Sequence, residues 1–267
     1  MKSCKVFLLT LLFVVLMSGC NTMRVLTVQS PVYPEQVSPE PDKRLERSRT
    51  GAVLWQQTGN NDLISTVSGS VVAIKTITPT DTLIEHENIS SGIILPGGLV
   101  VTTAHGLDMA GKIFINHAAS EYSGKIVDLD IGYDLALIKL NRDQALAYSI
   151  PEIRFNLRPT LGMQVFCAGY PVIEGVEDTQ PAITSGVVSV LQRSLRRSNG
   201  QLHTGLIQID AVATEGNSGG PVFDQEGRIL GLTGYTITTR NIWSGATFVI
   251  PAEQIVDFMN RNKIQVK

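Results

Sequence analysis

From residue 65 onward the chain is a succession of short runs rich in valine, isoleucine and threonine, separated by glycine, proline and aspartate. Runs of this kind predict β-strands joined by turns. Two sets of about six strands follow one another with almost no helical periodicity between them, which predicts an all-β fold of two packed β-barrels or β-sandwiches. The first set is contained in SGSVVAIKTI, SGIILP, LVVTTA, KIFINH, GKIVDLD and LALIKL, and the second in QVFCAGYP, ITSGVVSVLQ, LIQIDA, PVFD, RILGLTGYTI and GATFVIP.

The expected globular domain occupies residues 63–267, with lobes at about 65–148 and 160–252. Only the segment at 251–262, PAEQIVDFMNRN, has helical spacing, with its apolar residues on one face. We therefore expect one short C-terminal helix after the strands.

The first 19 residues have the composition of a signal peptide. Lys2 and Lys5 precede an apolar run from Val6 to Met17, which is too short to span a bilayer as a helix. The sequence Met17-Ser18-Gly19-Cys20 that follows resembles the lipobox of bacterial lipoproteins, in which the signal is cut before a cysteine that carries lipid. We expect lipidation of Cys20; the alternative is an ordinary secretory signal with a chance cysteine.

Residues 20–62 are expected to form a proline-rich tether, since Pro31, Pro34, Pro39 and Pro41 interrupt the segment. Of the three cysteines, only Cys167 would then remain free in the folded domain, so no intramolecular disulfide is expected. Its apolar surroundings in QVFCAGY predict a core residue.

Charge excludes one class of function. Loss of Lys2 and Lys5 with the signal peptide would change the formal net charge from −2 to −4, and nucleic-acid-binding proteins show basic clustering instead. The single basic cluster, Arg193 with Arg196 and Arg197, is predicted to be a solvated loop, so no nucleic-acid partner is expected.

The glycine-rich stretch TEGNSGGPV, residues 214–222, contains the candidate nucleophile Ser218. A serine needs a base and a group that orients the base. His105 follows a strand directly in LVVTTAHGL, and Asp134 opens the strand in GYDLALIKL. We predict that these three residues form a catalytic triad, with the amides of Gly216 and Ser218 as an oxyanion hole.

The other histidines, at positions 86, 117 and 203, have no partner pattern and are predicted to be surface or loop residues. No metal-ligand spacing is present, so neither a metal nor another cofactor is expected.

The segments TTAHGL, YDLALIKL and DAVATEGNSGGPVF are similar to the three signatures of trypsin-like serine proteases, specifically of the bacterial HtrA (Deg) branch. The resemblance extends over about residues 65–262. It implies the chymotrypsin/trypsin-like fold of two packed six-stranded β-barrels and a serine endopeptidase acting on protein or peptide substrates. His105 would be general base and acid, Asp134 would orient it, and Ser218 would attack.

The sequence also departs from that family. HtrA proteins usually carry a PDZ domain after the protease, and none is expected here. Asn217 precedes the nucleophile in place of the aspartate of digestive enzymes, so activation by a new N-terminus is not expected. HtrA relatives often form trimers, which leaves a homo-oligomer open.

The resemblance also suggests a substrate pocket. Its floor lies about six residues before the nucleophile, at Val212, and its wall comes from Thr233, Gly234 and Tyr235. None of these residues is acidic, so an apolar, small or medium P1 residue is expected.

Together these features predict a lipid-anchored serine endopeptidase of the bacterial cell envelope. Asn21 follows the lipidated cysteine, and the absence of Asp at this position resembles the outer-membrane sorting signal of Gram-negative lipoproteins, which predicts a protein facing the periplasm. Inner-membrane retention and a Gram-positive host are the alternatives for location. The alternative for function is a latent or inactive protease-fold protein that binds or senses.

Overall fold

The computed structural model describes residues 67–78, 86–107, 110–117, 120–141, 153–173, 180–197, 199–239 and 242–264. All of them belong to one compact unit, Trp55–Lys267. The predicted signal peptide, Cys20 and the tether up to residue 62 lie outside the described residues.

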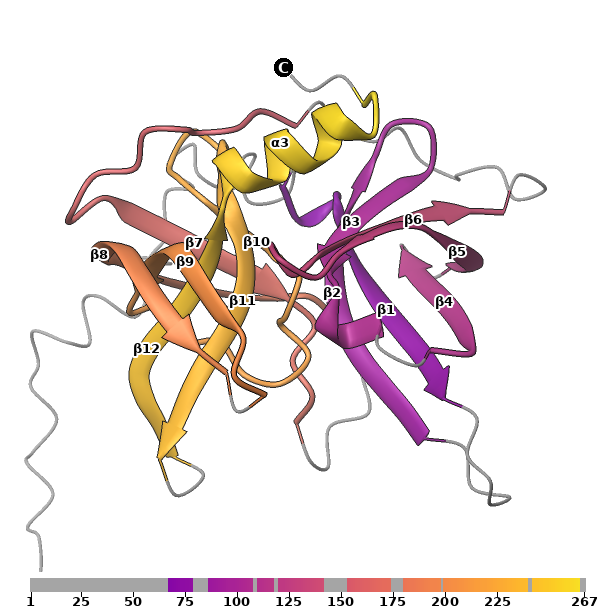
Figure 1. Ribbon diagram of the computed structural model, residues 1–267, viewed down its shortest axis with the longest axis horizontal. Helices are drawn as coiled ribbons and strands as arrows, with labels where there is room; N and C mark the ends of the chain where they lie inside the picture. The colour runs from indigo at the N-terminus through magenta and orange to yellow at the C-terminus, as the bar shows by residue number, and fades with distance from the viewer. Residues whose placement is uncertain are drawn as a thin grey trace, which may run out of the picture. The chain divides into compact units, whose positions relative to one another are not determined.

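The unit contains two closed antiparallel barrels of six strands each, which confirms the predicted all-β fold (Figure 1). The first has the strand order β1-β2-β3-β6-β5-β4 and consists of β1 (Val71–Thr78), β2 (His86–Leu95), β3 (Leu99–Thr103), β4 (Lys112–His117), β5 (Ser120–Asp130) and β6 (Leu135–Leu140). The second has the order β10-β11-β12-β9-β8-β7 and consists of β7 (Gln164–Gly169), β8 (Ala182–Arg196), β9 (Leu202–Ile209), β10 (Pro221–Phe223), β11 (Ile229–Thr239) and β12 (Ile242–Pro251).

Side chains that alternate along the strands divide the core into three parts. On β3, Val100 packs inside the first barrel, whereas its neighbour Val101 belongs to a cluster shared with the second barrel. On β7, Cys167 packs inside the second barrel and Phe166 faces the shared cluster. This period of two is what a strand between a barrel interior and a neighbouring barrel requires. Cys167 is buried, as predicted.

Helix α3 (Ala252–Arg261) follows β12 directly and contacts both barrels. Its apolar face places Phe258 and Met259 in the shared cluster. At its other end, Nη2 of Arg261 lies 2.6 Å from Oδ2 of Asp130, the last residue of β5. The predicted C-terminal helix is therefore present, and it anchors the end of β5 in the first barrel.

One element is longer than predicted. Strand β8 continues to Arg196 because its last residues pair with β9, Arg196 lying opposite Leu202. Arg193 and Arg196 therefore lie on a strand and not in the solvated loop that their charge suggested.

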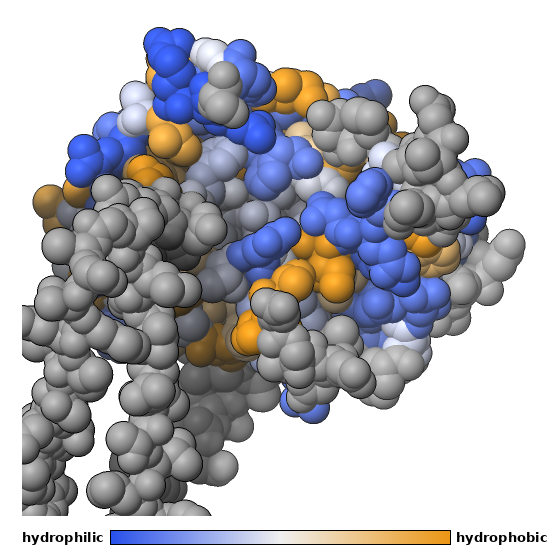
Figure 2. Space-filling view, turned by 90° about the horizontal axis from the view of Figure 1, so that it is seen from below, coloured by the Kyte–Doolittle hydropathy of each residue, from blue (hydrophilic) through white to orange (hydrophobic). Residues whose placement is uncertain are grey.

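Exposed apolar side chains are distributed over several elements. They include Val127 and Ile131 at the end of β5, Leu161 ahead of β7, and Val172 and Val212 near the glycine-rich loop. Figure 2 shows one face of the molecule, on which hydrophobic patches are interspersed with hydrophilic ones.

Candidate active site

His105 and Asp134 are joined directly. His105 opens the short 3-10 helix η1 (His105–Leu107) after β3, and its ring Nδ1 lies 2.6 Å from Oδ2 of Asp134. The second carboxylate oxygen accepts the backbone N–H of His105 at 2.9 Å. The His105 side chain remains 24% exposed, whereas that of Asp134 is 3% exposed. An imidazole held at Nδ1 in this way presents Nε2 for proton transfer.

The backbone of Asp134 takes a conformation that few non-glycine residues adopt, with φ of 58°. The preceding turn stabilises it, because the N–H of Tyr133 donates to Oδ1 of Asp130 at 2.8 Å and the Asp134 carbonyl accepts the N–H of Ala104 at 3.0 Å. A strained residue held by its neighbours is a frequent feature of functional sites.

Burial by itself would raise the pKa of the Asp134 carboxyl group. Hydrogen bonds from His105 and Tyr235, together with the charge of a protonated His105, outweigh burial and lower that pKa below its usual value. The side chain is therefore a carboxylate at neutral pH and can accept hydrogen bonds from both partners.

Ser218 lies on the loop that precedes β10, where this loop crosses the end of β3. A Cβ added to the next residue, Gly219, would lie 2.2 Å from the carbonyl oxygen of Ser91 and 2.2 Å from Oγ1 of Thr102. Gly219 also has φ of 85°, so glycine is required here on two counts. This contact places the nucleophile loop against the strand that leads to His105.

The backbone amides around Ser218 alternate in their bonding. The N–H groups of Asn217, Gly219 and Gly220 donate to carbonyls at 2.7–3.1 Å. Within the described residues, the N–H groups of Gly216 and Ser218 donate to no protein acceptor. The carbonyl of Glu215 accepts the N–H of Val172 at 2.9 Å, and because a trans peptide is planar this turns the Gly216 N–H the opposite way. Among the described amides of residues 216–220, the two predicted for the oxyanion hole are thus the ones without a protein acceptor.

Ser91, on β2 of the first barrel, holds this loop of the second barrel in place. Its hydroxyl donates to the Gly216 carbonyl at 2.7 Å and accepts the Tyr170 N–H at 2.8 Å. Its own N–H donates to the Ser218 carbonyl at 2.7 Å. Because Ser91 is fully buried, these bonds do not compete with water, and they fix both carbonyls that flank Asn217.

The four residues predicted for the substrate pocket have different surroundings. Val212 is 42% exposed and its carbonyl accepts from Oγ1 of Thr184, while Thr233 is buried with its hydroxyl 3.1 Å from Sγ of Cys167. Gly234 follows Thr233 in sequence, and a Cβ there would lie 3.1 Å from the Ile250 side chain. The hydroxyl of Tyr235 lies 2.5 Å from Oδ2 of Asp134, a contact that the sequence did not predict.

Two histidines lie deeper than predicted. His203 is 3% exposed, and its Nε2 lies 3.2 Å from the Tyr235 hydroxyl. His117 is 4% exposed, and its Nε2 lies 2.7 Å from the Gly69 carbonyl. The prediction of surface or loop positions was wrong for both, because each is the inward-facing residue of an alternating strand. In β9 the local pattern indicated the opposite, since apolar Leu202 beside His203 faces solvent.

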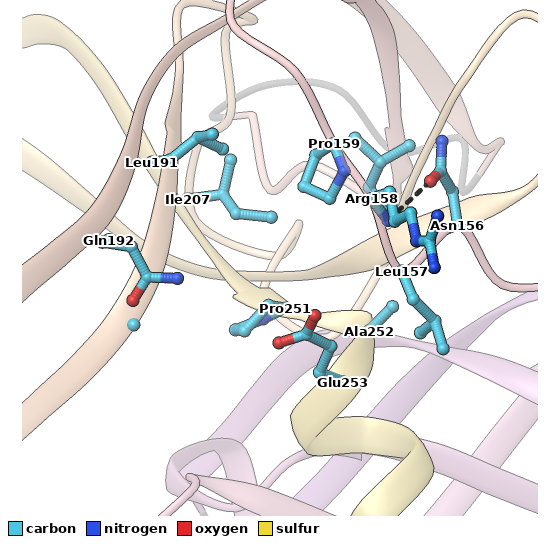
Figure 3. Close-up of a pocket in the computed structure, with 12 residues that line it drawn as sticks. Asn156, Leu157, Arg158, Pro159, Leu191, Gln192, Ile207, Pro251, Ala252 and Glu253 are labelled. Atoms are coloured by element: carbon cyan, nitrogen blue, oxygen red, sulfur yellow. Dashed lines mark hydrogen bonds between the residues drawn. The ribbon is translucent and has the colours of Figure 1, made fainter.

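The described residues also form a pocket of about 200 Å³ away from the triad (Figure 3). It lies between β8, β9 and the start of α3, and no predicted site residue lines it.

In the part of the chain that the structure describes, no group of three acidic, histidine or cysteine side chains could hold a metal ion. No helix among these residues is long and apolar enough to cross a membrane.

We expect Ser91→Ala to destabilise the fold by about 1–3 kcal/mol, because it leaves the buried Gly216 carbonyl and the Tyr170 N–H without their partner. Ser90→Ala is the matched control, since the Ser90 hydroxyl is buried but bonds to nothing among the described residues. Ser90→Ala should leave the free energy of unfolding nearly unchanged or raise it. Urea midpoints of the two variants would measure the difference, and equal midpoints would contradict the role given to Ser91.

Comparison with known proteins agrees with this geometry. The model of the trypsin-like peptidase domain matches residues 90–232, a range that includes His105, Asp134 and Ser218. Serine protease HTRA4 of Mus musculus is 33% identical over 64% of this chain and 33% of its own length. Serine protease HTRA1 of Xenopus laevis is 32% identical over 64% of this chain and 35% of its own length.

A probable periplasmic serine endoprotease, DegP-like, of Hahella chejuensis (strain KCTC 2396) is 31% identical over 67% of this chain and 36% of its own length. The chain thus spans about a third of the length of the relatives it matches. Because the family model covers more than half of the 267 residues, the chain belongs to the trypsin-like peptidase family, and its relatives are proteases of the HtrA branch.

Proposed function

We propose that this protein is a serine endopeptidase that hydrolyses peptide bonds in exported or envelope proteins through an acyl-enzyme on Ser218. The observation that carries the proposal is the direct pairing of the His105 ring with the buried Asp134 carboxylate at 2.6 Å. A histidine oriented by a carboxylate, together with a serine on a glycine-rich loop that packs against the strand leading to the histidine, is the arrangement expected for nucleophilic acyl transfer.

In this mechanism Oγ of Ser218 attacks the carbonyl carbon of the scissile peptide bond, and Nε2 of His105 takes the hydroxyl proton. Asp134 keeps the ring in the required tautomer through Nδ1 and stabilises the imidazolium. The amides of Gly216 and Ser218 would receive the oxyanion. His105 then gives its proton to the leaving amine, and a water molecule hydrolyses the ester by the same steps.

A fluorophosphonate probe tests this mechanism, because it reacts with activated serines. We expect the purified full chain to be labelled and Ser218→Ala to remain unlabelled. Asp134→Asn should label about 10⁴-fold more slowly, the loss known for the equivalent change in a well-studied triad. Ser189→Ala, at an exposed position on β8, is the control and should label like the unchanged protein.

A second candidate function is a latent or inactive protease-fold protein that binds or senses. One observation favours it: in the described residues, Ser218 Oγ makes no hydrogen bond to the His105 ring. In active serine proteases such hydrogen bonds are often long before substrate binds, so the absence of this bond is also compatible with catalysis. Absence of labelling in a folded chain would favour the second candidate.

We further propose that the enzyme prefers an apolar P1 residue of small or medium size. Val212 contributes an apolar side chain that is 42% exposed, and Val172, next to the glycine-rich loop, is 45% exposed. A panel of peptides that differ only at P1 should be cleaved fastest after alanine or valine. Selective cleavage after arginine would overturn this proposal.

For location, we propose a lipid anchor on Cys20 in the outer membrane, with the domain facing the periplasm. The sequence Met17-Ser18-Gly19-Cys20 supports the anchor, and the name of a DegP-like relative describes that protein as periplasmic. Expressed in a Gram-negative host with radiolabelled palmitate, the chain should take up label and sediment with outer membranes. Cys20→Ser should do neither, and an unlabelled, unsedimented parent chain would refute the anchor.

A further inference from the structure

The Asp134 carboxylate has a third hydrogen-bond donor, and this donor comes from the other barrel. Oδ1 accepts the N–H of His105, and Oδ2 accepts both Nδ1 of His105 and the hydroxyl of Tyr235. Tyr235 lies on β11 of the second barrel, whereas His105 and Asp134 belong to the first. A buried carboxylate is costly unless its oxygens are bonded, so the loss of any one donor should be measurable.

Tyr235 lies between two histidine rings. Its ring stacks on that of His105, with centroids 5.6 Å apart and planes inclined by 25°. The His203 ring also contacts the Tyr235 ring, and the centroids of these two rings are 5.2 Å apart. The guanidinium of Arg197 lies 5.5 Å from the centre of the same tyrosine ring. The tyrosine side chain is therefore held from several directions.

The donors in the hydrogen bonds that link Asp134, Tyr235 and His203 can be assigned by counting hydrogen atoms. A tyrosine hydroxyl has one hydrogen, and it is donated to Asp134, which as a carboxylate can only accept. The 3.2 Å contact between the hydroxyl and His203 must then use the N–H of Nε2 as donor. Burial lowers the pKa of His203, and although the nearby Asp134 charge opposes this, the net shift is downward and favours the neutral ring.

We propose that Tyr235 is a positioning residue of the triad: with His203 behind it, it holds the Asp134 carboxylate in line with the His105 ring. This inference rests on the proposed function, since it assigns Tyr235 to the same site. Burial and the neighbouring Asp134 charge raise the pKa of Tyr235 well above its usual value, so the hydroxyl keeps its hydrogen at neutral pH.

The arrangement makes the triad depend on both barrels twice. Ser218 comes from the second barrel, and so does the group that fixes the orienting acid. A change in how the barrels meet would therefore move Tyr235 away from Asp134 as well as Ser218 away from His105. The family match ends at residue 232, before Tyr235, so Tyr235 is assigned from its contacts in this chain.

Two measurements on the full chain test the role of Tyr235. The first is the low-field proton resonance of His105 Nδ1–H, recorded in a Ser218→Ala background so that it is independent of turnover. Tyr235→Phe should shift this resonance or remove it, because one donor to Oδ2 is gone. Tyr122→Phe is the control: Tyr122 is buried, at 4% exposure, and packs inside the first barrel, whereas Tyr235 is partly buried against the shared cluster. It should leave the resonance in place.

The second measurement is the rate of fluorophosphonate labelling as a function of probe concentration. Tyr235→Phe should lower the maximal rate by about tenfold or more, the order expected for one hydrogen bond to a charged group, without changing the half-saturating concentration. Tyr122→Phe should not. If the parent chain is unlabelled, the proposed function fails, and the resonance alone decides the role of Tyr235.

His203 supplies a second pair of variants in case Tyr235→Phe does not fold. His203→Gln keeps an N–H donor near the Nε2 position, whereas His203→Leu removes it. The glutamine variant should retain more of the native resonance position and of the labelling rate than the leucine variant. An unchanged resonance in Tyr235→Phe, or equal effects of the two His203 variants, would overturn the proposal.

Discussion

The site depends on one buried carboxylate. Asp134 is 2% exposed, and a charge in that position is stable only if its oxygens are bonded. The fold meets this requirement with two residues: the backbone N–H and ring of His105, and the hydroxyl of Tyr235. Each of these contacts also orients the carboxylate, so the interactions that make its burial tolerable are the ones that position the candidate base.

Bonds between the two barrels also hold the loop that carries Ser218. Ser91 belongs to the first barrel and bonds to the carbonyls of Gly216 and Ser218 in the second. Tyr235 bonds in the opposite sense, from the second barrel to the first. Together with helix α3, whose Arg261 reaches Asp130, these bonds cross the junction between the two barrels. The shared apolar cluster brings the barrels together, and the polar bonds determine how they are aligned.

The sequence predicted what depends on local pattern. Alternating apolar residues identified the twelve strands of the two barrels, and the short motifs led to His105 and Asp134, which the structure joins. What it missed depends on pairing between distant segments. Arg196 is in a strand because Leu202 lies opposite it, which charge cannot reveal. Tyr235 bonds to a residue 101 positions away, so its sequence context suggested a pocket wall and gave no sign of the carboxylate.

The central claim is that Ser218, His105 and Asp134 act with the unpaired amides of Gly216 and Ser218. A crystal structure of the chain with a peptide boronic acid tests this claim most directly, because boron mimics the tetrahedral intermediate. We predict a covalent bond from Ser218 Oγ to boron, and one boronate oxygen about 2.7–3.1 Å from both amides. A boronate bound without that covalent bond, or with the Gly216 amide turned away from it, would contradict the account.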